Sequence, residues 1–374
     1  MPSLETGGAE RSTVEIAAAL SREGFRPLVV SEGGRMVEEL TAAGGEWISL
    51  PVNAKSPSTL IRNAWRLRDI IRTRSISLVH ARSRAPAWSA WWAARKTGIP
   101  FVTTYHGLYT ARFPLKRLYN SVMVRADAVI ANSEWTAAHI GSEYKFAPRR
   151  LVVIPRGVDL ARFAPELVAP ERVAKLRAAW GANEQDVVLL LPGRLTRLKG
   201  QAVFIAALSK LLQSKASPPA IRAVLAGDAQ GRDAYVAELQ HAVTANGLEN
   251  KVTFAGHVTD MPAACLAADI VLSASTQAES FGRIVAEASA MGRPVIATDH
   301  GGARETVLPE LSGVLVPPGD ADALATALLK LFAMGPDGRA AMGAQGRAHI
   351  ERNYTVERMQ QDTIALYREL LALS

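Results

Sequence analysis

The hydrophobic pattern of the chain consists of short apolar runs that alternate with longer stretches of mixed polarity. The apolar runs lie at residues 27–30, 76–79, 101–104, 128–131, 187–191, 223–226, 270–272 and 294–297. Such runs, without polar alternation, are typical of strands that are buried on both faces. Strands that alternate with helices predict parallel sheets covered by helices on both sides.

The strand–helix repeat is interrupted near the middle of the chain. Residues 154–159 read Ile-Pro-Arg-Gly-Val-Asp, and Pro165 and Pro170 follow, which predicts a linker. At 374 residues the chain is long enough for two hydrophobic cores. We therefore predict an α/β protein with two Rossmann-like, doubly wound domains at 1–157 and 158–354, and a ligand cleft between them.

The beginning of the chain departs from this pattern. A doubly wound domain usually opens with a strand, but Gly-Gly-Ala-Glu at residues 7–10 comes almost directly after Met1-Pro2-Ser3-Leu4. We expect the first strand to be missing or reduced to a stub. Because the loss of a central strand leaves neighbouring strand edges unpaired, we hypothesise that Met1 is an internal start. Translation of the gene upstream of Met1 tests this hypothesis.

Composition places the chain among ordinary globular proteins, with 48% hydrophobic and 21% charged residues. Its one cysteine, Cys265, cannot form an internal disulfide, which agrees with a reducing compartment. No apolar run approaches the roughly 18 residues that a membrane-spanning helix needs. The sequence predicts a cytoplasmic protein.

The net charge of +8 is concentrated in the first half of the chain, where residues 1–160 hold 22 Lys and Arg against 13 Asp and Glu. Arginines crowd one stretch, together with several tryptophans: Arg62, Arg66, Arg68, Arg72, Arg74, Arg82 and Arg84, with Trp65, Trp88, Trp91 and Trp92. A solvated helix face, an anionic acceptor and peripheral contact with the anionic inner membrane would each explain this charge. No zinc-finger spacing or RNA-binding signature accompanies it, so we predict no nucleic-acid partner.

A basic loop follows the apolar run 187–191. It reads Gly193-Arg-Leu-Thr-Arg-Leu-Lys-Gly200 and leads into a predicted helix near Gln201. Arg194 and Lys199 therefore lie at the carboxyl end of a strand, beside helix N–H groups, where phosphate binds well. We predict that Gly193, Arg194 and Lys199 bind a diphosphate, and that Arg197 faces solvent.

Two glutamates eight residues apart supply hydrogen-bond acceptors, in Glu279-Ser-Phe-Gly-Arg-Ile-Val-Ala-Glu287. Ser280, Phe281 and Gly282 open a helix and can offer free N–H groups to a ligand. At about 1.5 Å rise per residue the two carboxylates lie on the order of a dozen Å apart. A retaining glycosidase needs its pair about 5 Å apart, so this spacing favours sugar transfer over hydrolysis. We expect Glu279 to bind the transferred sugar and Glu287 the ribose.

Residues of the first half complete the predicted site. His106 follows the apolar run 101–104. Gly7 and Gly8 have no side chain and allow the backbone to approach a bound sugar donor closely. The Asp-Ala-Asp sequence at 320–322 resembles a metal motif, but its flanking residues predict a helix N-cap instead. Binding residues for a diphosphate, a ribose and a sugar together predict a nucleoside diphosphate sugar as the ligand. We predict no metal and no cofactor beyond it.

These motifs resemble family 4 glycosyltransferases of the GT-B fold. The resemblance rests on residues 7–10, 106–107, 155–159, 193–200, 256–257, 279–287 and 301–305. It implies two facing Rossmann-like domains, a nucleotide site in the second one, and a C-terminal helix at 355–374 that joins the first. It also implies retaining, metal-independent transfer by front-face displacement.

By the same resemblance, Arg194 and Lys199 stabilise the leaving phosphate, and His106 contacts the sugar near the reaction centre. The sequence around His80, Arg82 and Arg84 is similar to bacterial enzymes that build lipopolysaccharide or other surface glycans, which implies a glycan or lipid-linked acceptor near these residues. Two alternatives stay open. One is a nucleotide-sugar-binding protein with impaired catalysis, and the other is a sugar-nucleotide epimerase of the same fold.

Overall fold

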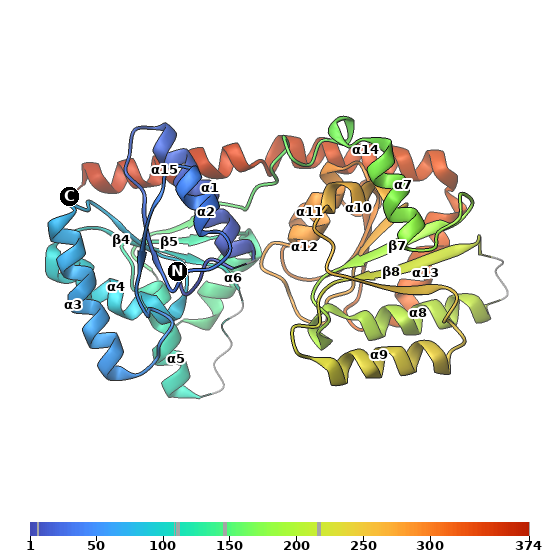
Figure 1. Ribbon diagram of the computed structural model, residues 1–374, viewed down its shortest axis with the longest axis horizontal. Helices are drawn as coiled ribbons and strands as arrows, with labels where there is room; N and C mark the ends of the chain where they lie inside the picture. The colour runs from blue at the N-terminus through green and yellow to red at the C-terminus, as the bar shows by residue number, and fades with distance from the viewer. Residues whose placement is uncertain (6, 108, 110–112, 145–147, 215–217, 374) are drawn as a thin grey trace. The chain divides into compact units, whose positions relative to one another are not determined.

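The computed structural model describes residues 1–5, 7–107, 109, 113–144, 148–214 and 218–373. The chain forms two compact units (Figure 1). Unit 1 comprises Met1–Gly157 together with Val356–Ser374, and unit 2 comprises Val158–Thr355. Each unit has parallel strands and helices that alternate along the chain, which confirms the predicted two-domain α/β fold.

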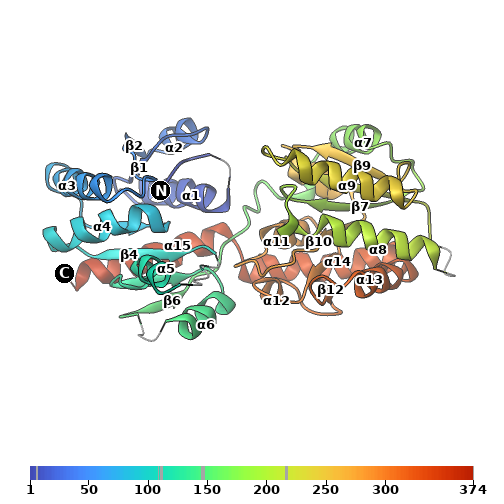
Figure 2. The same ribbon diagram turned by 90° about the horizontal axis from the view of Figure 1, so that it is seen from below.

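Unit 1 contains two parallel sheets rather than one. The first has the order β1-β2 and the second β3-β4-β5-β6. The strands are β1 (Leu28–Ser31), β2 (Glu46–Ser49), β3 (Val79–Ala81), β4 (Phe101–Tyr105), β5 (Ala128–Ala131) and β6 (Leu151–Val153). The helices are α1 (Gly8–Arg22), α2 (Val37–Ala42), α3 (Pro57–Thr73), α4 (Arg84–Thr97), α5 (Pro114–Asn120), the short 3-10 helix η1 (Ser121–Val124), α6 (Glu134–Glu143) and α15 (Val356–Ala372). Figure 2 shows β1 and β2 set apart from β4 and β6.

The first four residues form a short extended segment beside the end of β1. The Met1 nitrogen donates to Val30 O (3.0 Å), and Leu4 N donates to Gly33 O (2.7 Å). Leu4 is fully buried against α1 and α2. In the part of the chain that the structure describes, no strand lies between β1 and β3, so the sheet of unit 1 is divided there.

Helix α15 completes unit 1 because one of its faces is apolar. Met359, Leu366 and Leu370 are buried with residues of α1, β4 and β5. Gln360 adds polar contacts, since its side-chain nitrogen donates to Glu15 O at 2.8 Å and its oxygen accepts from Arg22 at 2.9 Å. The end of the chain therefore packs on the same unit as its beginning.

Unit 2 has one six-stranded parallel sheet with the order β12-β11-β10-β7-β8-β9. Its strands are β7 (Val187–Pro192), β8 (Ile221–Ala226), β9 (Val252–Gly256), β10 (Ile270–Ser273), β11 (Val295–Thr298) and β12 (Gly313–Val316). Its helices are α7 (Pro170–Ala179), α8 (Gln201–Gln213), α9 (Asp233–Ala245), α10 (Met261–Ala267), α11 (Arg283–Ala290), α12 (Ala303–Thr306), α13 (Ala321–Ala333) and α14 (Gly335–Asn353), with the short 3-10 helices η2 (Pro165–Leu167) and η3 (Arg197–Lys199). Buried apolar clusters cover both faces of this sheet.

The strand order of unit 2 reverses between β7 and β10. From β7 the chain proceeds through β8 to β9 on one side, and then returns to place β10 on the other side of β7. In open parallel sheets, ligands bind outside the carboxyl ends of the two strands at such a reversal. The loops at this position follow Pro192 and Ser273, and they carry the basic motif and the first of the two glutamates.

Two further observations bear on the sequence predictions. The Asp320 side chain accepts a hydrogen bond from Ala323 N at 2.9 Å, which confirms the predicted helix cap. Among the residues that the structure describes, no helix combines the length and the apolar character needed to cross a bilayer.

Candidate active site

The two loops at the reversal point of unit 2 are tied to each other by two hydrogen bonds from Thr276 to backbone carbonyls. Thr276 N donates to Leu198 O at 2.9 Å, and the Thr276 hydroxyl donates to Arg197 O at 3.2 Å. Gly200 has a positive φ of 72°, and a Cβ there would collide with Ala274 O. A side chain at position 200 would therefore push the loops apart, so glycine is required for their close approach.

Lys199 and Glu279 meet between these loops. The Lys199 ammonium lies 2.8 Å from Oε1 of Glu279, and the two side chains are only 24% and 29% exposed. The Ser275 hydroxyl donates to the same carboxylate oxygen. His300 and Thr298 hold Ser275 in turn, since both contact its carbonyl oxygen, at 2.9 and 3.0 Å. A cation and a carboxylate are thus fixed side by side at the carboxyl ends of β7 and β10.

The electrostatics of this cluster favour an ionised Glu279. Burial by itself would raise the pKa of Glu279, but the Lys199 ammonium and the Ser275 hydrogen bond outweigh burial and hold this pKa below its ordinary value. Glu279 is therefore a charged hydrogen-bond acceptor at neutral pH. An acceptor of this kind binds sugar hydroxyls.

Glu287 lies on α11, one helix turn beyond Arg283. The Arg283 Nε donates to Glu287 at 2.6 Å, and the Glu287 side chain is only 7% exposed. Gly282, with φ 75°, is the N-cap of α11. Ser280 and Phe281 are buried immediately before it. The structure therefore places residues 280–282 at a helix N-terminus, and it places Glu287 in an ion pair on that helix.

The loop that contains Glu279 is packed against two further glycines. Gly302 N donates to Glu279 O at 2.8 Å. A Cβ on Gly301 would collide with the Glu279 backbone, and one on Gly302 would collide with Phe281. Gly301 also has a positive φ of 62°. These glycines let the loop after β11 lie directly on the Glu279 loop and fix its path.

The two arginines of the basic loop differ in their surroundings. Arg194 is exposed, and its carbonyl accepts from the Gln201 side chain at 3.0 Å. Arg197 turns toward α9, where it pairs with Glu238 at 2.6 Å and lies over the Tyr235 ring. Gly193, with φ 150°, lies beneath the Lys199 stem, since a Cβ there would be 3.4 Å from Cδ of Lys199. Lys199, not Arg197, is therefore the cation that this loop holds beside Glu279.

Unit 1 has its own basic cluster at the carboxyl ends of its strands. Arg82 follows β3, His106 follows β4, and Arg156 follows β6. Nε of Arg82 lies 3.3 Å from Nε2 of His106, and Nη2 of Arg156 lies 2.9 Å from its Nδ1. Arg82 also donates to the Ser12 hydroxyl on α1 at 3.0 Å. A Cβ on Gly8 would collide with the Arg156 guanidinium.

This cluster keeps His106 neutral. Burial is the largest cause, and the nearby charges of Arg156 and Arg82 add to it, so that the pKa of His106 falls well below its ordinary value. Burial also lowers the pKa of Arg82. The result is a partly buried, positively charged site near the beginning of α1.

The other predicted residues of unit 1 have different contacts. His80 is held between the Tyr367 hydroxyl on α15 and the Thr104 hydroxyl, with 2.7 Å to the latter. Arg84 donates to Asn120 at 2.9 Å and covers the Tyr109 ring. Gly7 is the N-cap of α1, and its carbonyl accepts from Arg11 N. Of the predicted residues, the structure brings Arg82 to His106, and it brings Gly8 to Arg156, which contacts His106.

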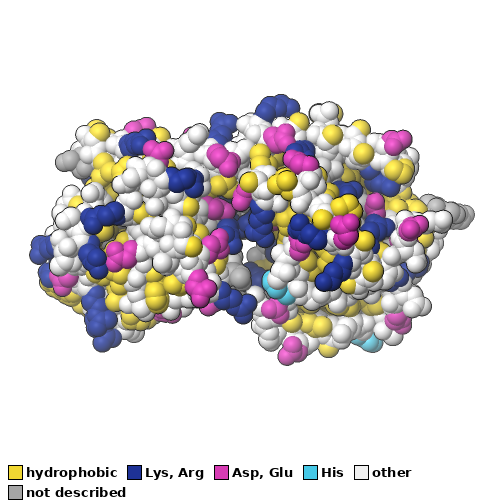
Figure 3. Space-filling view, turned by 45° about the horizontal axis from the view of Figure 1, so that its top comes forward, with side chains coloured by type: hydrophobic (Ala, Val, Ile, Leu, Met, Phe, Trp, Pro, Cys, Tyr) yellow, Lys and Arg dark blue, Asp and Glu magenta, His cyan; other side chains and the backbone are white. Residues whose placement is uncertain are grey.

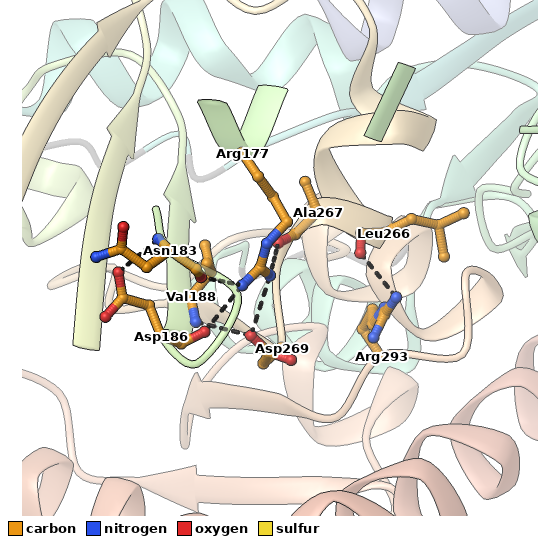
Figure 4. A network of polar contacts seen from close by, with 8 residues as sticks. All are labelled: Arg177, Asn183, Asp186, Val188, Leu266, Ala267, Asp269 and Arg293. Carbon is orange, nitrogen blue, oxygen red and sulfur yellow. Dashed lines mark hydrogen bonds and ion pairs between the residues drawn. The ribbon is translucent and has the colours of Figure 1, made fainter. Parts of the chain in front are cut away.

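A separate polar network lies at the opposite, amino-terminal edge of the unit 2 sheet (Figure 4). Arg177 donates to Ala267 O at 2.9 Å and to Asp186 O at 2.9 Å, while Asp269 accepts from Val188 N at 2.8 Å. These bonds satisfy backbone groups where β7 and β10 begin, and they fasten α7 to the sheet. We interpret this network as structural.

Sequence reasoning missed three residues of the two sites. Ser275 and His300 follow β10 and β11, a position that could have drawn attention to them, but their contacts with the Glu279 loop depend on tertiary packing. Arg156 lies in the predicted linker and among the residues of the family resemblance, but the sequence alone gives it no role in the site. It follows Pro155 at the end of β6, and its partner His106 is 50 residues away.

The fold, together with the cluster of Lys199 and Glu279 at the strand ends, defines a glycosyltransferase with two α/β domains. The chain belongs to the family 4 glycosyltransferases. The model for Glycosyltransferase Family 4 matches residues 6–162, and the model for Glycosyl transferases group 1 matches residues 173–349.

Individual proteins agree with this assignment. A glycosyltransferase from Rickettsia africae superposes with a TM-score of 0.91 and 32% identity, over 100% of this chain and 98% of that one. Anabaena HepE in complex with UDP and glucose superposes with a TM-score of 0.83 and 27% identity, over 97% and 96% of the two chains. A D-inositol 3-phosphate glycosyltransferase from Segniliparus rotundus is 29% identical over 79% of this chain. The match spans 66% of that relative, just under two thirds of its length.

Proposed function

We propose that this chain transfers a sugar from a nucleoside diphosphate sugar to a glycan or lipid-linked acceptor, with retention of configuration and without a metal ion. The contact between Lys199 and Glu279 at the reversal point of the unit 2 sheet is the observation that carries this proposal. It provides a cation for the leaving diphosphate and an acceptor for the sugar hydroxyls within one cluster. The similarity to HepE, crystallised with UDP and glucose, supports such a donor.

In this proposal the acceptor oxygen bonds to the anomeric carbon of the sugar as the bond from that carbon to the phosphate oxygen breaks. The departing phosphate takes the proton of the acceptor hydroxyl. Arg194, Lys199 and the N–H groups of residues 280–282 stabilise the charge that grows on the diphosphate. Because Glu279 already holds the Lys199 ammonium in position, little reorganisation is needed during the reaction. Glu287 is the proposed partner of the ribose hydroxyls.

The acceptor is assigned to unit 1, where His106 lies between two arginines. Arginine binds carboxylate and phosphate groups through paired hydrogen bonds, so the cluster favours an acceptor with an anionic group. The relative from Segniliparus rotundus is named for a phosphorylated acceptor, D-inositol 3-phosphate. A lipopolysaccharide core or another anionic surface glycan is the acceptor class that we propose for this chain, and His106 is the proposed contact of unit 1 with the sugar near the reaction centre.

Peripheral attachment to an anionic membrane fits the surface of unit 1. The exposed side chains of Phe113, Leu115 and Leu118 lie at α5 beside Lys116 and Arg117. Figure 3 shows Lys and Arg side chains at several places on the face of unit 1 drawn at the left. Apolar side chains enter the headgroup region while cations attract anionic lipids. Co-sedimentation with phosphatidylglycerol vesicles, but not with phosphatidylcholine vesicles, is the expected result.

A donor-binding protein without turnover is the second candidate, and the divided sheet of unit 1 favours it. Calorimetry would then show donor binding, while no product would form with any acceptor. The enzyme hypothesis instead predicts acceptor-dependent release of a nucleoside diphosphate.

The test of transfer is an assay of nucleoside diphosphate release from UDP-, GDP- and ADP-sugars with a pool of glycan acceptors. Arg194→Ala and Glu279→Ala should nearly abolish release. Arg197→Ala is the matched control, because Arg197 is a cation of the same loop that pairs with Glu238 instead. Unchanged turnover in Arg194→Ala and Glu279→Ala would refute the proposal.

A further inference from the structure

A cavity of about 760 Å³ separates the two sheets of unit 1. Residues 28–30 of β1 line one side of it, and residues 78–81 line the side of β3. Ile16 and Leu20 of α1 line one face, and Leu67, Ile70 and Ile71 of α3 contribute further apolar lining. We call this cavity the strand slot.

Two strand edges face the slot. In β1, the carbonyl oxygens of Pro27 and Ser31 accept hydrogen bonds from the side of β2. Because the peptide groups of successive residues in a strand point to opposite sides, those of Leu28 and Val30 point away from β2 and toward the slot. Val30 O already accepts from the Met1 nitrogen there. In β3, Val79 N donates to Pro100 O on the side of β4, so the peptide groups of His80 point into the slot.

The burial of the strand residues also indicates that the position between β1 and β3 is unfilled. Every residue of β4 and β5 is buried, as expected for central strands. In contrast, Leu28, Val30, Val79 and His80 are only half-buried, although their strands lie between helical layers. Helices cover both faces of the slot with apolar side chains, so a strand placed in it would be buried on both faces. Such strands are apolar at every position.

We infer that the strand slot holds one extended apolar peptide segment of about five residues, which joins β1 to β3 as a parallel strand and is bonded at its carboxyl end to the nitrogen of Met1. Residues 1–4 already run parallel to β1, so a segment that continued this ladder backward from Met1 would lie beside Leu28, which lines the slot. A segment attached at Met1 therefore enters the slot without an intervening loop.

The surroundings of the Met1 nitrogen agree with a peptide bond at this place. Burial, with a smaller contribution from Arg82, lowers the pKa of the Met1 ammonium to about 5. A peptide N–H makes the same hydrogen bond to Val30 O without placing a charge in the interior. A separate peptide or a second copy of the chain would instead bring a chain end or a crossing loop to this buried position.

The experiment compares the 374-residue chain with two chains extended before Met1, one by Val-Ile-Val-Leu-Val and one by Ser-Asn-Thr-Gln-Ser. Thermal unfolding and hydrogen exchange at Val30 and His80 are the measurements. The apolar extension should raise Tm by about 5 °C or more, and it should slow exchange at both amides at least about tenfold. The polar extension should change neither quantity.

Leu20→Asp in the apolar extended chain is the second variant, because Leu20 lines the slot and is only half-buried. It should remove the gain in Tm while the fold persists. Equal Tm values and equal exchange for the two extended chains would overturn the inference. So would a concentration-dependent dimer of the 374-residue chain that already protects Val30 and His80, since a second copy would then be the occupant.

Discussion

The Lys199 ammonium lies 2.8 Å from the Glu279 carboxylate, across 80 residues of sequence and two neighbouring strand ends. Each residue alone is an ordinary charged side chain at the end of a loop. Together, with Ser275 bonded to the same carboxylate, they form a partly buried cluster at the point where ligands bind in open parallel sheets.

Replacement of Lys199 should damage the chemical step. Lys199→Ala removes a cation that is already positioned for the leaving diphosphate, and removal of one such group typically costs about 10²–10³ in kcat. Steady-state kinetics with a saturating donor measures this loss. Arg197→Ala should stay within a few-fold of the unmodified chain. A similar loss in both variants would mean that general basicity, not the position of Lys199, is what matters.

The charge state of Glu279 should depend on Lys199. Burial alone raises the pKa of Glu279, and Lys199 is the largest influence that opposes it, so Lys199→Ala should move this pKa upward. Carbon-detected NMR of the labelled Glu279 carboxyl measures the shift directly. A pKa that stays where it was would show that Lys199 does not govern the ionisation of Glu279.

Gly301→Ala should destabilise unit 2 more than the same change at Gly247. Both glycines have a left-handed backbone, with φ of 62° and 63°, so the backbone cost is matched. A Cβ on Gly301 would collide with the Glu279 backbone, whereas nothing lies within 4 Å of one on Gly247. The additional loss in the free energy of unfolding should be about 1–3 kcal/mol. Urea denaturation of the two variants measures it, and equal losses would contradict the packing described here.

Stability should fall on mild acidification because of His106. Its pKa is well below the ordinary value of 6.5 in the folded protein, mainly through burial, whereas the unfolded chain binds a proton near pH 6.5. The contribution of neutral His106 to the free energy of unfolding is therefore fully present above pH 6.5. As the pH falls from 6.5 toward the pKa of His106 in the folded protein, this contribution decreases by up to about 1.4 kcal/mol per pH unit. His106→Gln should make the free energy of unfolding less dependent on pH between 6.5 and 5. An identical pH dependence in the variant would exclude His106 as the source.

The sequence predicts the fold well where strands are central. The apolar runs at 101–104, 128–131 and 187–191 correspond to β4, β5 and β7, which are buried along their whole length. The runs do not reveal β2, β6 and β9. The partly exposed strands β2 and β9 carry polar residues, whereas β6 is apolar but only three residues long. The strand β12 was also not predicted, although three of its four residues are buried.

The sequence locates the site in part. The basic loop and Glu279 are predictable because phosphate and sugar binding at strand ends calls for those residue types. The contacts of Ser275, His300 and Arg156 are not predictable in this way, since each depends on a partner brought close only by folding. The position of a residue after a strand is the one signal that they share.

The most direct test of the central claim is calorimetric titration of UDP-glucose, and of GDP- and ADP-sugars, into the protein and its variants. We predict that one of these donors binds, and that Lys199→Ala and Glu279→Gln weaken its binding by at least about tenfold while Arg197→Ala does not. Binding of that donor with equal affinity to the unmodified protein, Lys199→Ala and Glu279→Gln would contradict the account.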